Sequence, residues 1–181
     1  MGVLNAGLTG NRLLHDVLGP NTLARFDRDV LTQTGVTHVI VLVGNNDIGV
    51  GWEGGIDPSN PVSACQIIQG YIQLIERAHN NNLRIYGGTL PPFEGAGLDN
   101  VLGDFYPYFS RENEAKRQTI NAWIRTSGAF DGVIDFDAAL RDPNNVTRML
   151  PVFDSGDHLH PNDAGYKALA NAIDLMLLAQ R

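Results

Sequence analysis

The sequence predicts a single α/β domain over residues 1–181, in which helices cover both faces of a parallel β-sheet. Short apolar runs rich in β-branched residues alternate with longer segments whose apolar residues recur at helical spacing, and this alternation is typical of such folds. The chain is long enough for one hydrophobic core and contains no repeat or low-complexity linker. Polar segments follow the predicted strands, at the edge where parallel sheets bind their ligands.

The first half of the chain contains two predicted helices and two predicted strands. Residues 21–34 carry apolar side chains on one helical face. Residues 37–43 predict a strand that ends at Gly44, and the apolar run at residues 39–43 is expected of a strand that is covered on both faces. A helix over residues 62–80 ends at consecutive asparagines, and a strand follows over residues 83–90.

The second half continues the alternation. Residues 112–127 predict a helix, residues 132–135 a short strand and residues 163–179 a terminal helix. Met176 is expected among the inward-facing residues of that last helix. Strands and helices therefore alternate along the whole chain.

The overall charge limits the classes of partner. The formal net charge is -7, which argues against nucleic acids and anionic membranes because both are polyanions. No apolar run reaches the length of a membrane span, and the single cysteine excludes an intrachain disulfide. As written, the sequence predicts a soluble cytoplasmic protein, or a secreted one if a signal peptide was lost with an earlier start, so the compartment stays open.

The most informative segment is residues 155–162, which places Asp157 three residues before His160 and just ahead of a helix start. A carboxylate beside an imidazole can orient the ring and stabilise it when it takes a proton, so this pair resembles the acid/base half of a hydrolytic triad. Two alternatives stay open. His158 and His160 with nearby carboxylates could bind zinc, or the histidines could simply be solvated while Asn162 or Asp163 caps the helix.

Two further loops carry candidate residues. One follows the strand predicted at residues 37–43, and the other precedes the first predicted helix. Residues 44–49 contain two glycines around Asn46, whose amide could stabilise a developing oxyanion. Residues 5–11 form a glycine-spaced loop that could present a backbone N–H group to an oxyanion or a phosphate. The alternative for both is an ordinary turn in which Asn, Asp and Gly serve the backbone.

A long aromatic segment, residues 91–109, follows the strand at residues 83–90. Loops of this length are often functional, and Phe93, Tyr106 and Tyr108 could wall a pocket for an acyl group or a sugar. The alternative is that these rings fold back onto the core.

Taken in their order along the chain, the polar loops at residues 5–11, 44–49 and 155–162 resemble the conserved blocks of the SGNH (GDSL-type) hydrolase family of esterases and lipases. Gly10 matches the glycine that donates an oxyanion N–H, Asn46 matches the oxyanion-hole asparagine, and Asp157 and His160 match the triad acid and base. The resemblance implies a flavodoxin-like three-layer α/β/α fold and hydrolysis of a small-molecule carboxylic ester, an acyl ester of a sugar or a lipid, without a cofactor or metal. The neighbouring Asn11 and Asp47, with Phe93, Tyr106 and Tyr108, are then expected to bind substrate.

The chain departs from the family at the block that carries the nucleophile. None of its serines, Ser59, Ser63, Ser110, Ser127 and Ser155, lies in a Gly-Asp-Ser context. We therefore expect an N-terminally truncated domain whose first strand is missing or replaced. Either activity is weak or lost, or the chain is a non-catalytic carbohydrate- or lipid-binding relative that keeps the pocket. The lost strand also predicts a homo-oligomer, or a rearranged sheet with Val3 and Leu4 moved inward.

Overall fold

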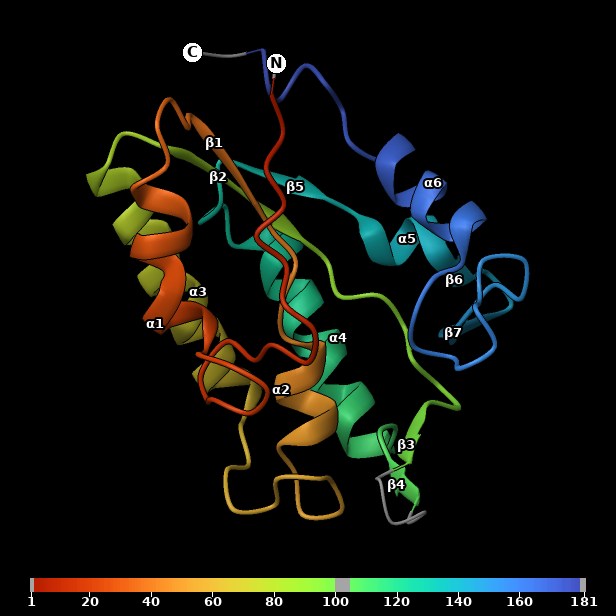
Figure 1. Ribbon diagram of the computed structural model, residues 1–181. Coiled ribbons are helices and arrows are strands. Elements are labelled where there is room, and N and C mark those ends of the chain that lie inside the picture. The colour runs from red at the N-terminus through yellow and green to blue at the C-terminus, as the bar shows by residue number, and fades with distance from the viewer. Residues whose placement is uncertain (1, 100–104, 180–181) are drawn as a thin grey trace.

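A parallel β-sheet with helices on both faces forms the centre of the computed structural model, which describes residues 2–99 and 105–179 (Figure 1). Three strands pair in the order β1-β2-β5, namely β1 (His38–Val41), β2 (Arg84–Gly88) and β5 (Gly132–Ile134). Both pairings are parallel, with Val39 opposite Ile85 and Gly88 opposite Ile134. The predicted α/β fold with a parallel, helix-covered sheet is confirmed.

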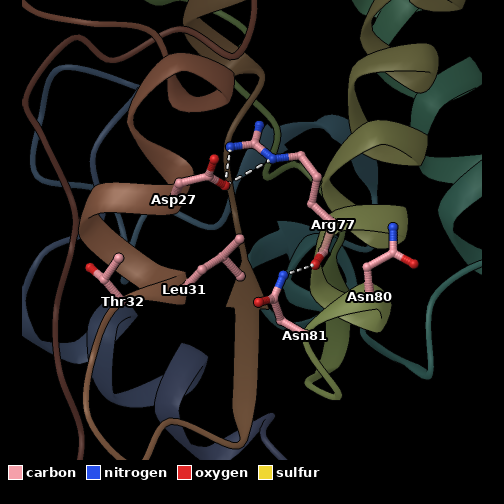
Figure 2. A pocket seen from close by; sticks show the side chains of 6 residues that line it. All are labelled: Asp27, Leu31, Thr32, Arg77, Asn80 and Asn81. Atoms are coloured by element: carbon pink, nitrogen blue, oxygen red, sulfur yellow. Dashed lines mark hydrogen bonds and ion pairs between the residues drawn. The ribbon is translucent and has the colours of Figure 1, made fainter.

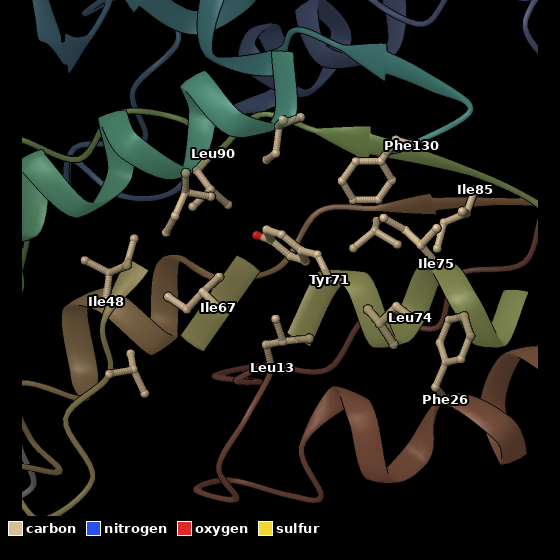
Figure 3. Close-up of a cluster of buried hydrophobic side chains, with 14 of the residues drawn as sticks. Leu13, Phe26, Ile48, Ile67, Tyr71, Leu74, Ile75, Ile85, Leu90 and Phe130 are labelled. Carbon is tan, nitrogen blue, oxygen red and sulfur yellow. The ribbon is translucent and has the colours of Figure 1, made fainter. Parts of the chain in front are cut away.

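One face of the sheet carries the larger core (Figure 3). It is covered by α1 (Thr22–Phe26), its wider π-helical continuation η1 (Asp27–Leu31), α3 (Ala64–Asn80) and α4 (Arg111–Thr126). Tyr71 and Leu74 of α3 and Ile120 of α4 are buried here against Val41 and Ile85. The short helix α2 (Asn45–Val50) follows the carboxyl end of β1 and adds Ile48 to the same core.

The other face carries a smaller core under the C-terminal part of the chain. Tyr86, Ile134 and Phe136 are buried there, the last of them at the start of α5 (Phe136–Leu140). They are covered by α6 (Asp163–Asn171) and the turns that follow it, through Leu169, Ala172, Ile173, Leu177 and Leu178. Helices on both faces thus make three layers.

Local sequence explains where the long helices begin. Ser63 caps α3, and with Gln66 it forms a reciprocal capping box. Ser110 accepts the N–H of Asn113 at the start of α4, and Asn162 accepts that of Gly165 at the start of α6. Each cap satisfies a backbone donor that lacks a partner within its helix.

Two hairpins were not predicted. One joins β3 (Gly97–Asp99) to β4 (Phe105–Pro107), and the other joins β6 (Arg141–Asp142) to β7 (Asn145–Met149). The fully buried Arg117 of α4 fixes the second one, because its guanidinium donates to the carbonyl oxygens of Leu90 and Val146 and to the Asp137 carboxylate. This cation therefore joins α4, the segment after β2, α5 and β7.

The terminal helix is shorter than predicted. It ends at Asn171 instead of residue 179, and turns follow it. In these turns the Asp174 carboxylate accepts the N–H of Met176, a local bond that replaces helical pairing. Met176 is consequently exposed, and the prediction that it faces inward was wrong.

The N-terminal segment does not join the sheet. Val3 and Leu4 lie in irregular backbone with 87% and 73% of their surface exposed, so the expected move of these residues into a rearranged sheet was wrong. Within the described residues β1 is an edge strand, and its Ile40 is exposed. The part of the chain that the structure describes has no helix long and apolar enough to cross a membrane.

Candidate active site

Asp157 and His160 lie on the loop between β7 and α6 and form a close pair. The distance from Asp157 Oδ2 to His160 Nδ1 is 2.6 Å. The other carboxylate oxygen accepts the backbone N–H groups of Leu159 and His160 at 2.9 and 2.8 Å. With Nδ1 engaged, Nε2 has no hydrogen bond among the described residues and is the nitrogen that can take a proton. A carboxylate–imidazole contact of this kind is what the acid/base half of a hydrolytic triad requires.

The hydrogen bonds at Asp157 hold it in its charged form. Partial burial opposes ionisation, but the backbone N–H and the ring of His160, the N–H of Leu159 and the Ser155 hydroxyl together keep the pKa of Asp157 well below its usual range. A carboxylate that stays charged can stabilise the imidazolium formed when His160 accepts a proton.

The serines of the chain have structural partners. Ser155 Oγ donates to Asp157 Oδ1 at 2.9 Å, so this hydroxyl is engaged with the carboxylate of the pair. The other four serve backbone or loop groups, since Ser63 and Ser110 cap helices, Ser59 donates to Asp57 and Ser127 accepts the N–H of Ala129. None of them donates to a histidine ring.

Gly10 and Asn46 come together at the start of α2. Asn46 Nδ2 donates to the carbonyl oxygen of Asn11 at 3.1 Å, while Asn46 Oδ1 accepts the Tyr108 hydroxyl at 3.1 Å. Gly10 has φ +66, and a Cβ atom there would lie 2.6 Å from Leu18, so the turn requires glycine. The Gly10 N–H has no acceptor among the described residues. The structure thus places one free N–H and one amide group in neighbouring segments.

Asn11 and Asp47 hold the N-terminal loop in place. Asn11 is buried, and its side chain bonds to Pro20, Thr22 and Arg25. Asp47 is fully buried and accepts the N–H groups of Leu13 and Leu14 at 2.6 and 3.1 Å. Burial raises the pKa of Asp47, against the effect of these N–H groups and of Arg12. Both side chains therefore contact the protein itself and are not exposed to a cleft.

The aromatic side chains are also packed inside. Phe93 and Tyr108 are buried and lie edge to face, with ring centroids 5.3 Å apart. Tyr106 is half-buried in β4. Of the three rings expected to wall a pocket, the structure places two in the core.

The predicted site has two parts, the Asp157–His160 pair and the segments that carry Gly10 and Asn46. No hydrogen bond or ion pair between described residues joins Asp157 or His160 to Gly10 or Asn46. Two open pockets lie elsewhere, one of about 380 Å³ between η1 and the end of α3 (Figure 2) and one of about 560 Å³ beside residues 4–8. Neither is lined by the acid/base pair. Among the described residues, no three His, Cys, Asp or Glu side chains are grouped so that they could hold a metal ion.

One feature of the site was not anticipated from the sequence. A second carboxylate–imidazole pair, Asp154 with His158, lies on the same loop, with 2.6 Å between Asp154 Oδ2 and His158 Nδ1. The spacing of four residues was visible in the sequence. The close pairing depends on a positive φ of 61° at His158, which spacing alone does not reveal.

Comparisons with known proteins agree with the fold. The sequence profile of the GDSL-like Lipase/Acylhydrolase family matches residues 1–168. No curated protein sequence matches the chain. An acetylxylan esterase from Geobacillus stearothermophilus aligns with TM-score 0.63 and 20% identity, over 98% of this chain and 72% of that one. A GDSL-like lipase from Bacteroides thetaiotaomicron VPI-5482 aligns with TM-score 0.63 and 15% identity, over 87% and 69%. At these identities the structures show a shared fold.

Proposed function

This chain belongs to the GDSL-like lipase/acylhydrolase family, and we propose that its site is built for hydrolysis of carboxylic esters by acyl transfer. The observation that carries the proposal is the 2.6 Å contact between Asp157 Oδ2 and His160 Nδ1, with Nε2 left for proton transfer. His160 is the general base and Asp157 its orienting and charge-stabilising partner.

Gly10 and Asn46 are assigned the role of stabilising the oxyanion of the tetrahedral intermediate. The Gly10 N–H is free, and Asn46 Nδ2 would exchange its bond to the Asn11 carbonyl for one to the tetrahedral intermediate. Tyr108 supports the role of Asn46 as an oxyanion donor. Its hydroxyl donates to Asn46 Oδ1, so Asn46 Nδ2 is directed away from the Tyr108 ring. The buried Asn11 and Asp47 would then act by fixing the loop that carries Gly10, instead of binding substrate themselves.

The proposal assigns no nucleophile to the five serines, because each already serves a structural partner. In triad enzymes that lose their nucleophile, the oxyanion hole and substrate binding still leave roughly 10³–10⁴-fold catalysis over water. We therefore expect slow hydrolysis in which His160 activates a water molecule. Acetyl esters are the first substrates to test, because a protein of this fold is an acetylxylan esterase.

The test combines labelling with kinetics. The chain is treated with a fluorophosphonate probe, adducts are mapped by peptide mass, and hydrolysis of p-nitrophenyl acetate is measured beside the His160→Ala variant. We expect no adduct and slow turnover that is lost in the variant. A single Ser or Thr adduct that depends on His160 would show that the chain has a nucleophile, and would refute that part of the proposal. Equal turnover in both proteins would instead favour a non-catalytic carbohydrate- or lipid-binding protein.

A further inference from the structure

The loop that carries His160 contains two interleaved carboxylate–imidazole pairs. In each pair one oxygen meets a ring Nδ1 at 2.6 Å, Asp154 with His158 and Asp157 with His160. The remaining oxygen of Asp154 accepts the N–H groups of Gly156 and His158 at 2.8 and 3.0 Å. Asp157 therefore lies inside the turn that Asp154 closes, and the geometry of the second pair depends on the first.

The two pairs differ in burial. The Asp154 side chain is only 9% exposed and that of His158 48%, whereas Asp157 and His160 are 47% and 62% exposed. Asp154 is also fixed through its backbone, because Asn162 Nδ2 donates to its carbonyl oxygen at 3.0 Å and because it bridges to Pro161. The Asp154–His158 pair is thus attached to the start of α6, while the Asp157–His160 pair is the more exposed to solvent.

The ring of His158 is held by a separate segment of the chain. A Cβ atom on Gly95 would lie 3.0 Å from His158 Cδ2, so the ring lies directly against the Gly95 backbone. Glu94 in turn is anchored to β7, where its N–H donates to the Thr147 carbonyl at 3.0 Å and its carboxylate accepts the Thr147 hydroxyl and Asn145 Nδ2. The neighbouring segment therefore provides a fixed support for the imidazole.

His158 itself has φ +61, a backbone conformation that is uncommon outside glycine but that histidine and asparagine adopt more often than most residues. Such a conformation persists where surrounding contacts determine it. Here those contacts are the bonds of His158 to Asp154 and the packing of its ring on Gly95.

We infer that Asp154 and His158 are positioning residues, which fix the loop so that Asp157 can hold the His160 ring with Nε2 free. This inference rests on the proposed function only in taking His160 as the base. His158 is not a catalytic residue in this assignment, because its ring packs directly against the Gly95 backbone and is less exposed than that of His160.

Two substitutions separate the hydrogen bond from the backbone conformation. His158→Gly favours the positive φ and keeps the backbone N–H bond to Asp154, but it removes the ring donor to Asp154 Oδ2. His158→Asn tolerates the same φ, and its amide can replace Nδ1 as a donor. His79→Ala is the matched control, since His79 forms a carboxylate–imidazole pair with Asp131 at 3.0 Å on α3, away from this loop.

The measurement is the long-range ¹H–¹⁵N imidazole spectrum of the labelled full chain, with His160 assigned by its loss in His160→Ala. In the native protein we expect neutral His160 to carry its proton on Nδ1. In His158→Gly the signal should shift toward the Nε2-protonated form, whereas His158→Asn and His79→Ala should match the native protein. In Gly95→Ala the added Cβ would press on the His158 ring and alanine would be strained at φ +96, so this variant should also act like His158→Gly, and circular dichroism checks that it is folded.

An unchanged His160 tautomer in folded His158→Gly or Gly95→Ala would overturn the inference. An equally large shift toward the Nε2-protonated form in His158→Asn would overturn it as well. The spectrum decides this even if the chain hydrolyses nothing, so failure of the proposed function is recognised separately. Where turnover is measurable, kcat should fall roughly 10- to 100-fold in His158→Gly with KM unchanged, because misplacement of the base affects the chemical step.

Discussion

Replacement of Asp47 by alanine should destabilise the fold strongly, because this buried carboxylate serves two backbone donors. Its oxygens accept the N–H groups of Leu13 and Leu14 at 2.6 and 3.1 Å, and the carboxylate lies 3.8 Å from Nε of the fully buried Arg12. That Arg12 nitrogen has no hydrogen-bond partner of its own. Asp47→Ala would therefore leave two N–H groups unpaired and one buried cation less well compensated.

A donor that loses its acceptor on burial costs about 1–3 kcal/mol, so the buried Leu13 N–H and the part-buried Leu14 N–H together amount to about 4 kcal/mol of unfolding free energy. For a chain of this size, this loss corresponds to a decrease in Tm of roughly 8–16 °C. Asp47→Asn keeps one acceptor oxygen and should lose about half as much, about 2 kcal/mol.

Urea unfolding followed by far-UV circular dichroism at pH 7 measures both variants, with the slope m expected to stay unchanged. A loss below about 1 kcal/mol in Asp47→Ala would refute the reasoning from unpaired donors. Equal losses in the two variants would show that the charge of Asp47 matters and the number of acceptors does not.

Three further predictions concern the site and the sheet edge. Asn46→Ala should lower the rate of ester hydrolysis by roughly 10²–10³-fold while a thermal melt shows a folded protein; an unchanged rate would remove Asn46 from the oxyanion hole. Hydrogen bonds keep the pKa of Asp157 below its usual range despite partial burial, so the carboxylate stabilises the fold above about pH 4 and this contribution is lost as the pH falls through the lower folded-state pKa. The Tm advantage of the native protein over Asp157→Asn should accordingly shrink in acid, and a constant difference between pH 3 and 7 would contradict this. We also propose that the chain self-associates through β1, the edge strand of the sheet among the described residues, so Ile40→Lys should shift sedimentation velocity toward the monomer, and a native protein that already sediments as a monomer would refute this.

The sequence predicted the elements whose signal is strongly periodic. Helix α3 begins at a capping box and buries one face over 17 residues, and its predicted range of 62–80 differs from the observed one only at its start. The strand predicted over residues 37–43 is confirmed as β1, though shorter. Local patterns suffice in these cases because one element buries one apolar face.

The remaining features depend on contacts between distant segments. Arg12 and Arg117 are fully buried cations. Apart from Glu114, which lies three residues before Arg117, their hydrogen-bond partners lie 20 to 48 residues away, so the local sequence does not distinguish them from surface arginines. Asp47 was expected to bind substrate because it neighbours Asn46 in the loop that resembles a family block, whereas its carboxylate accepts the N–H groups of Leu13 and Leu14 in the N-terminal loop. Of the candidate site, the Asp157–His160 geometry was predictable because it is confined to four residues.

The unequal size of the two cores implies an unequal resistance to local opening. Among the residues that the structure describes, the smaller core holds Tyr86, Ile134 and Phe136 as its buried residues, and within α6 only Gly165 is buried. Such a unit is expected to open at a lower free energy than the rest of the chain, and its amide protons should exchange sooner than those of α3. The loop with Asp157 and His160 leads directly into α6, so a sub-global fluctuation of the C-terminal unit would disassemble the acid/base pair while the main core stays folded. The lifetime of the competent site would then be set by this fluctuation and not by global unfolding.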